Sequence, residues 1–149
     1  GKSTFIKKYL SGSEIISMDE IRAELGDRRD QSNNKKVALI AKERLKEALR
    51  KKKNVIWDAT SIRQEHREEL LSLAESYGAF TRLIVVLNKE SRIRSQNLKR
   101  EFSVPDEVIT RMINNFQFPS PIEAMSVLYF TSDLDRFVTA NDVTELSEI

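Results

Sequence analysis

The chain opens with Gly1-Lys2-Ser3-Thr4, and this tetrapeptide restricts the fold more than any other stretch of the sequence. Glycine, lysine and a hydroxyl residue in this order form the closing half of a P-loop, Gly-x-x-x-x-Gly-Lys-Ser/Thr, which runs directly into a helix. In a P-loop, backbone N–H groups at the helix N-terminus bind phosphates, the lysine reaches the outer phosphates and the hydroxyl holds Mg²⁺. The tetrapeptide alone also fits the polar start of an ordinary helix, so the rest of the chain must distinguish these interpretations.

The chain begins inside the motif and has no initiator Met. Since a P-loop follows a buried strand, we expect the first strand and the first glycine of the loop to precede Gly1. The first strand of the fold is therefore predicted to be missing from this sequence.

Apolar runs typical of buried strands alternate with amphipathic stretches typical of helices. The runs predict strands over residues 14–18, 55–60, 80–87 and 127–130. Helical spacing of apolar residues predicts helices over residues 5–10, 19–25, 35–50, 63–77 and 91–101, and another from residue 104. Ser61 and Gln64 have the spacing of a capping box for the fourth of these helices. The alternation predicts an α/β fold, a three-layer α/β/α sandwich around a parallel sheet, with the last two helices as an excursion from it.

The length and composition suit one domain. With 149 residues, 40% of them hydrophobic, the chain can bury one sizeable core, which we assign to residues 1–131. Residues 132–149 are predicted to be a polar C-terminal tail or linker. No apolar run approaches the length of a membrane span and no signal peptide is visible, so a cytoplasmic location is the default expectation.

Several chemistries are excluded by residue counts. The chain has no cysteine and one histidine, which removes disulfides, thiolate metal sites and most histidine-based catalysis. Any catalysis must therefore use Asp, Lys, Arg and hydroxyl groups. The net charge of +2 also excludes the broad attraction to nucleic acid that a strongly basic domain exerts.

Two aspartates lie at the carboxyl ends of predicted strands. Asp19 comes directly after residues 14–18, and Asp58 lies near the end of residues 55–60. Carboxyl ends of parallel strands are where ligands bind in open α/β sheets, so both carboxylates are candidates for a shared site. Phosphoryl transfer needs such groups, because it requires charge neutralisation at the γ-phosphate and a carboxylate that accepts the proton of the attacking hydroxyl. Either aspartate could instead be a helix cap or an ion-pair partner.

These features together resemble the 5′-polynucleotide kinase family of bacteria and their phages, within the P-loop phosphotransferases related to adenylate kinase. The resemblance extends to about Phe130 and rests on five motifs, which are Gly1-Lys2-Ser3-Thr4, Ser17-Met18-Asp19-x-x-Arg22, Val55-Ile56-Trp57-Asp58-Ala59-Thr60, Asn97-Leu98-Lys99-Arg100 and Val104-Pro105-Asp106-Glu107-Val108-Ile109-x-Arg111-Met112. It implies a P-loop kinase-like fold in which the excursion is a helical lid.

On the donor side, the resemblance implies that ATP and Mg²⁺ are bound. Gly1 would contribute to the phosphate cradle, Lys2 would contact the β- and γ-phosphates and Thr4 would assist there. Ser3 would hold Mg²⁺, and Asp58 would orient the water shell of the metal.

On the acceptor side, the resemblance implies that Asp19 is the general base for a 5′-hydroxyl and that Arg22 contacts the neighbouring phosphate. Arg100 would be a catalytic lid arginine that closes on the transferring phosphate. The bland alternatives are an ion pair between Arg22 and Asp19 and a solvated basic helix face for Arg100. The chain departs from the family at Gln96, where a second lid arginine is expected; Arg94 is nearby but out of phase.

The leading hypothesis is an ATP-dependent kinase that phosphorylates the 5′ ends of RNA or DNA in nucleic acid repair. Gln96 and the modest net charge leave open a small-molecule kinase acting on a nucleoside, sugar or antibiotic hydroxyl. A degenerate, kinase-like binding module without turnover is the third possibility. Fusion to, or cooperation with, phosphatase or ligase domains is an expectation from the resemblance.

Overall fold

A computed structural model describes residues 1–27, 32–139 and 141. Its elements follow one another in the order α1 (Lys2–Tyr9), β1 (Glu14–Ser17), α2 (Met18–Leu25), α3 (Asn34–Arg50), β2 (Val55–Asp58), α4 (Gln64–Ser76), β3 (Arg82–Leu87), α5 (Glu90–Leu98), α6 (Asp106–Asn114), β4 (Ser126–Thr131) and β5 (Arg136–Val138). Each predicted strand and helix within the described residues is present, with bounds shifted by a few positions.

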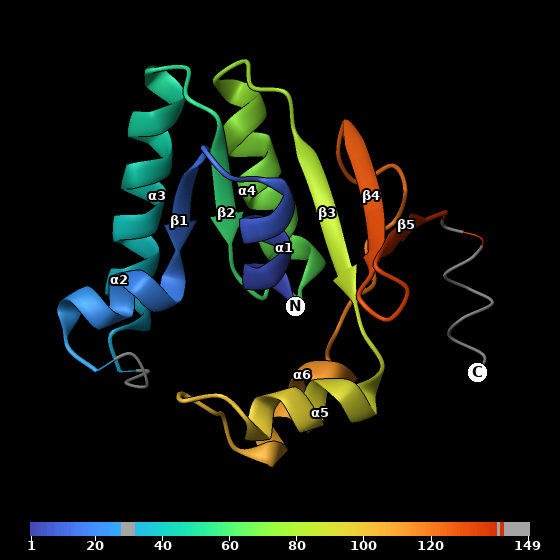
Figure 1. Ribbon diagram of the computed structural model, residues 1–149. Helices are drawn as coiled ribbons and strands as arrows, with labels where there is room; N and C mark the ends of the chain where they lie inside the picture. Colours follow the sequence, from blue (N-terminus) through green and yellow to red (C-terminus); the bar gives the residue numbers. More distant parts are fainter. Residues whose placement is uncertain (28–31, 140, 142–149) are drawn as a thin grey trace.

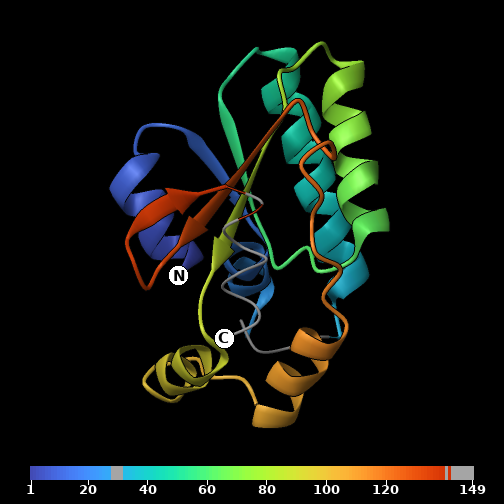
Figure 2. The ribbon, with the colours of Figure 1, turned by 90° about the vertical axis from the view of Figure 1, so that its right-hand side faces the viewer.

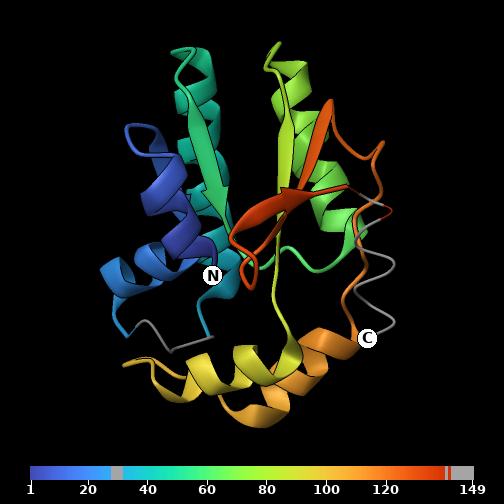
Figure 3. The same cartoon turned by 45° about the vertical axis from the view of Figure 1, so that its right-hand side comes forward.

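The strands form two hydrogen-bonded groups. β1 pairs with β2 in parallel, which places Ser17 opposite Asp58. β3 pairs with β4 in parallel, and β5 adds to β4 in antiparallel fashion. β2 and β3 point in the same direction (Figures 1 and 3), although the described residues include no ladder between them. The carboxyl ends of the four parallel strands therefore meet at one edge.

Helices cover both faces of the strands. Figure 2 shows α1 on one side and α3 and α4 on the other. The lid helices α5 and α6 lie beyond the carboxyl ends of the strands, on the same edge as α2 and the start of α1 (Figures 1 and 3). The predicted three-layer α/β/α fold with a parallel sheet is confirmed.

Each face of the strands has its own apolar packing. On one side, α3 buries Val37, Ala41, Leu45 and Ala48, the stripe that its spacing predicts, and the first three pack with Ile16 and Ile21. On the other side, the ring of Phe5 contacts those of Phe130 and Phe137 at centroid distances of 4.8 and 5.9 Å. No helix built from the described residues is long and apolar enough to cross a membrane.

One local expectation was wrong. Ser61 does not cap α4, where the Gln64 amide donates instead to Oε1 of Gln117 at 2.6 Å, and the φ of Ser61 is 42°. The position of Asp19 in the first turn of the helix after β1 is confirmed. β1 ends at Ser17, whose hydroxyl accepts from the Glu20 amide at 3.4 Å.

Strand β5 lies inside the segment predicted as a tail. It forms because Phe137 packs on α1 and β4, a contact that no local pattern in the sequence announces. Residues 140 and 142–149 lie outside the described residues, and the boundary at residue 131 stays a prediction.

Candidate active site

Lys2, Asp19 and Asp58 come from three different elements, and Lys2 and Asp19 both lie within electrostatic reach of Asp58. Burial raises the pKa of the Asp58 carboxyl above its ordinary value of 3.8. The negative charge of Asp19 adds to this rise, whereas the positive charge of Lys2 opposes it. A cation and two carboxylates thus share one end of the sheet, where ligands of open α/β folds bind.

The start of α1 is open to an anion. Lys2, Ser3 and Thr4 are exposed, no acidic residue occupies the first turn, and no side chain caps the helix. The first N–H groups of a helix have no partner inside it and carry a partial positive charge. Gly1 passes close to β3, since a Cβ atom there would lie 3.4 Å from Cγ1 of Val86. The start of α1 therefore presents backbone donors and Lys2 together.

Arg22 joins Asp19 to the start of α3. Nη1 of Arg22 donates to Oδ1 of Asp19 at 2.7 Å, and Nε donates to Oδ1 of Asn34 at 3.1 Å. The Arg22 side chain is 13% exposed, whereas that of Asp19 is 54% exposed. Arg22 and Asp19 therefore form the ion pair that the sequence allowed, and the Asp19 carboxylate stays accessible to solvent while Arg22 holds its Oδ1 atom.

Arg100 lies just past α5 and has no side-chain hydrogen bond or ion pair to any of residues 1–27, 32–139 or 141. The Arg100 guanidinium lies within electrostatic reach of Gly1, so its charge reaches the start of α1. A guanidinium without a protein partner can bind the oxygens of a phosphate.

Arg94 has its partners within the lid. Its guanidinium donates to Glu90 at 2.8 Å, to Asp106 at 2.7 Å and to the hydroxyl of Thr110 at 2.9 Å. These bonds tie α5 to α6. Arg94 therefore stabilises the lid from within.

A cavity of about 140 Å³ opens beside the start of α1, between that helix, α5 and the turn from β4 to β5. Two charged residues that line this cavity, Arg92 and Asp135, are not among the site residues predicted from the sequence. Arg92 stands four residues before Gln96, a spacing that the sequence shows and that could have identified it. Asp135 accepts from Lys8 at 2.6 Å, which ties the turn to α1.

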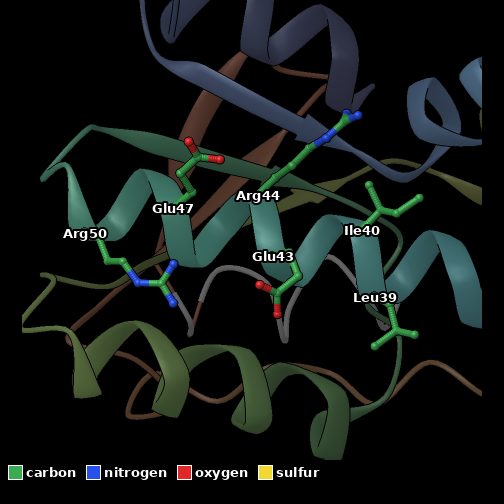
Figure 4. Close-up of a pocket in the computed structure, with 6 residues that line it drawn as sticks. All are labelled: Leu39, Ile40, Glu43, Arg44, Glu47 and Arg50. Atoms are coloured by element: carbon green, nitrogen blue, oxygen red, sulfur yellow. The ribbon is translucent and has the colours of Figure 1, made fainter.

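A larger hollow of about 530 Å³ runs along the outer face of α3 (Figure 4). All the residues that line this hollow belong to α3, and their side chains are spaced along the helix and do not converge on one point. The hollow is lined by Leu39, Ile40, Glu43, Arg44, Glu47 and Arg50. Arg44 is engaged with Glu24 at 2.6 Å. The hollow shares no lining residue with the site at the strand ends.

The residues at the strand ends fit a nucleoside triphosphate with Mg²⁺. Open helix donors, Lys2 and Arg100 match the charge of phosphates, and the Ser3 hydroxyl and Asp58 carboxylate are the hard oxygen ligands that Mg²⁺ prefers. Among the described residues, no three His, Cys, Asp or Glu side chains gather into a metal site. Mg²⁺ would therefore rely on phosphate oxygens and water for its remaining ligands, as it commonly does.

Comparison with known families agrees with this geometry. A family model described as an AAA domain matches residues 1–119, from Gly1-Lys2-Ser3-Thr4 to beyond α6. The chain belongs to this AAA domain family. The family is P-loop NTPase-like and includes kinases, so a P-loop nucleotide-binding, kinase-like domain is the class of this protein. No curated protein matches the chain. Within the AAA domain family, the narrower assignment to 5′-polynucleotide kinases stays a prediction.

Proposed function

We propose that this protein is an ATP-dependent phosphotransferase that moves the γ-phosphate onto the 5′-hydroxyl of an RNA or DNA end. The pairing of Asp19 with Arg22 beside Lys2 and Asp58 is the observation that carries the proposal. A carboxylate next to a guanidinium is suited to an acceptor that has a hydroxyl and a phosphate close together. A plain alcohol offers nothing for the guanidinium to bind.

Asp19 acts as the general base. One of its oxygens, Oδ1, is held by Arg22, and the half-exposed carboxylate remains accessible to an acceptor hydroxyl. Asp19 takes the proton of the 5′-hydroxyl, whose oxygen forms a bond to the γ-phosphorus. The bond between that phosphorus and the bridging oxygen of the β-phosphate breaks, and ADP leaves. Such a base contributes typically 10²–10⁴-fold to the rate.

Lys2, the first N–H groups of α1 and Arg100 neutralise the triphosphate in this proposal. Ser3 and Asp58 would hold the metal, directly or through its water. Mg²⁺, when bound, supplies charge neutralisation between the β- and γ-phosphates. The protein groups position the phosphates and keep them in line with the acceptor oxygen.

The test is transfer of labelled phosphate from γ-labelled ATP to an oligonucleotide with a 5′-hydroxyl, using the full-length protein. Asp19→Asn should lower transfer by about 10²–10⁴-fold while ATP binding persists. An oligonucleotide that already bears a 5′-phosphate is the matched acceptor control and should receive no label. Absence of labelled product from the natural protein would rule out the proposal.

A small-molecule hydroxyl kinase is the second candidate. It is favoured by the burial and hydrogen bonding of Arg22. This side chain is largely buried and already donates to Asp19 and Asn34, so it is less available to an acceptor phosphate. A salt titration separates the two candidates. An oligonucleotide held through several phosphates loses affinity steeply as salt rises, whereas a neutral metabolite does not. Binding of ATP without transfer to any acceptor would instead indicate a module without turnover.

A further inference from the structure

Three residues of the lid stand at four-residue spacing: Arg92, Gln96 and Arg100. Residues four apart on a helix lie on the same face, so the first two share a face of α5 that continues toward Arg100. Arg92 and Gln96 both line the cavity beside the start of α1, together with Gly1 and Thr4. This face of the lid is therefore the one that meets the P-loop helix.

Gln96 cannot supply charge to that face. Its side-chain oxygen accepts from the Asn88 amide at 3.3 Å, which occupies part of its hydrogen-bonding capacity. Arg92 is the cation on the same face one helical turn earlier. Arg92, like Arg100, lies within electrostatic reach of Gly1 at the start of α1.

Arg92 has one acidic partner among the described residues. Its Nη1 lies 2.8 Å from Oδ1 of Asp133 in the turn between β4 and β5. The two side chains are 47% and 23% exposed, and ion pairs as accessible as this contribute little to stability. A guanidinium has five donors, so one such bond leaves most of its hydrogen-bonding capacity available.

We propose that Arg92 is a second phosphate-binding arginine of the donor site, which exchanges Asp133 for the phosphates of a nucleoside triphosphate. This inference rests on the part of the proposed function that names ATP as the phosphate donor, and it does not depend on which acceptor is phosphorylated. A phosphate offers a guanidinium more charge and a better bidentate geometry than one carboxylate oxygen does. Asp133 holds Arg92 beside the cavity until the donor binds, and Arg92 then supplies a guanidinium to the face of α5 that also carries Gln96.

The experiment measures ATP affinity of the full-length protein by calorimetry, without any acceptor. Arg92→Gln should raise the ATP Kd by about 10–150-fold, the range for losing a charged hydrogen-bonded contact. Arg94→Gln is the matched control on the same helix, and it should change the ATP Kd by no more than about twofold because Arg94 bonds within the lid. Asp133→Asn, which removes the competing carboxylate, should lower the ATP Kd.

A rescue variant protects the test against a merely structural effect. Adding Gln96→Arg to Arg92→Gln should restore most of the ATP affinity, because it returns a guanidinium to the same face. Adenosine, which has no phosphate, should bind natural and variant proteins equally. The inference is overturned if Arg92→Gln leaves the ATP Kd within twofold, weakens adenosine as much as ATP, or is not rescued by Gln96→Arg.

These outcomes are independent of the acceptor. If ATP binding depends on Arg92 but no oligonucleotide is phosphorylated, the proposed acceptor fails and this inference stands. If oligonucleotides are phosphorylated and Arg92→Gln binds ATP normally, the inference fails and the proposed function stands. A natural protein that binds no ATP overturns both.

Discussion

Nη1 of Arg22 lies 2.7 Å from Oδ1 of Asp19, one turn earlier on α2. The pair forms because residues three apart on a helix are neighbours and because Asn34 holds the other side of the guanidinium. The base and the phosphate-recognising group of the proposed reaction are therefore in direct contact before any acceptor arrives.

Replacing Arg22 tests whether it recognises the acceptor or only positions Asp19. We expect Arg22→Ala to lower kcat/KM for a nucleoside 3′-phosphate by about 10–150-fold, since a charged hydrogen bond to the acceptor is lost. The plain nucleoside, which has no phosphate for Arg22, is the comparison acceptor. An equal loss for both acceptors would show that Arg22 acts only through Asp19.

The raised pKa of Asp58 predicts a pH dependence of stability. Because burial raises that pKa, the folded protein keeps the proton to a higher pH than the unfolded chain does. Ionising Asp58 therefore costs stability as pH rises from the ordinary value of 3.8 through the higher pKa of the folded state. Asp58→Asn should be more stable than the natural protein above this window and similar to it below, as measured by denaturant unfolding from pH 3 to pH 8.

Glu47 is a control with the opposite sign. Its hydrogen bond from Lys51 lowers the pKa of Glu47, so its contribution to stability is present above the unfolded-state pKa and is lost as pH falls through the lowered folded-state pKa. Glu47→Gln should therefore approach the natural protein in acid. An Asp58→Asn advantage that grows toward low pH would contradict the assignment of burial as the dominant cause.

Arg67 and Glu123 form an ion pair in which the side chains are only 3% and 4% exposed. Arg67 also donates to the carbonyls of Ser61 at 2.9 Å and Gln117 at 2.7 Å, so it joins the loop after β2 to the segment after α6. We expect Arg67→Met to lower the free energy of unfolding by about 3–5 kcal/mol, because it leaves the buried Glu123 carboxylate without its counter-charge and removes the Arg67 donor from two carbonyls.

A double-mutant cycle with Glu123→Gln isolates the pair. The double variant should lose less than the sum of the single variants, with a coupling of about 0.5–3 kcal/mol measured by chemical denaturation. The exposed pair of Lys51 and Glu47 is the control and should show a much smaller coupling than the buried pair. Additive losses at Arg67 and Glu123 would mean that they act separately.

Ile21 anchors α2, and with it Asp19, to the core. It is 1% exposed and packs with Val37 and Ile16. Ile21→Ala should cost about 2–5 kcal/mol of stability through lost burial and a residual cavity. Leu39→Ala on the outer face of α3 is the comparison; at 65% exposure it should change stability by no more than about 0.5 kcal/mol. Equal losses would show that the α2 contact is not part of the cooperative core.

Local patterns in the sequence determined the fold class and most of the elements. The stripe of α3 and the apolar runs of β2, β3 and β4 are visible without coordinates, because the burial of a helix face or a strand follows the spacing of its own residues. The sequence also predicted that Lys2, Asp19 and Asp58 lie at one edge of the sheet, because the carboxyl ends of parallel strands meet there.

Tertiary contacts decided what each charged residue does. Helical spacing alone does not distinguish the roles of Arg67, Arg92 and Arg94. In the structure, Arg67 is buried against Glu123, Arg94 is bonded within the lid, and Arg92 reaches the start of α1, as Arg100 does. Tertiary contacts also decided strand β5, which forms where the ring of Phe137 packs against those of Phe5 and Phe130. Spacing along a helix specifies which residues share a face, but only the arrangement of distant segments specifies what that face meets.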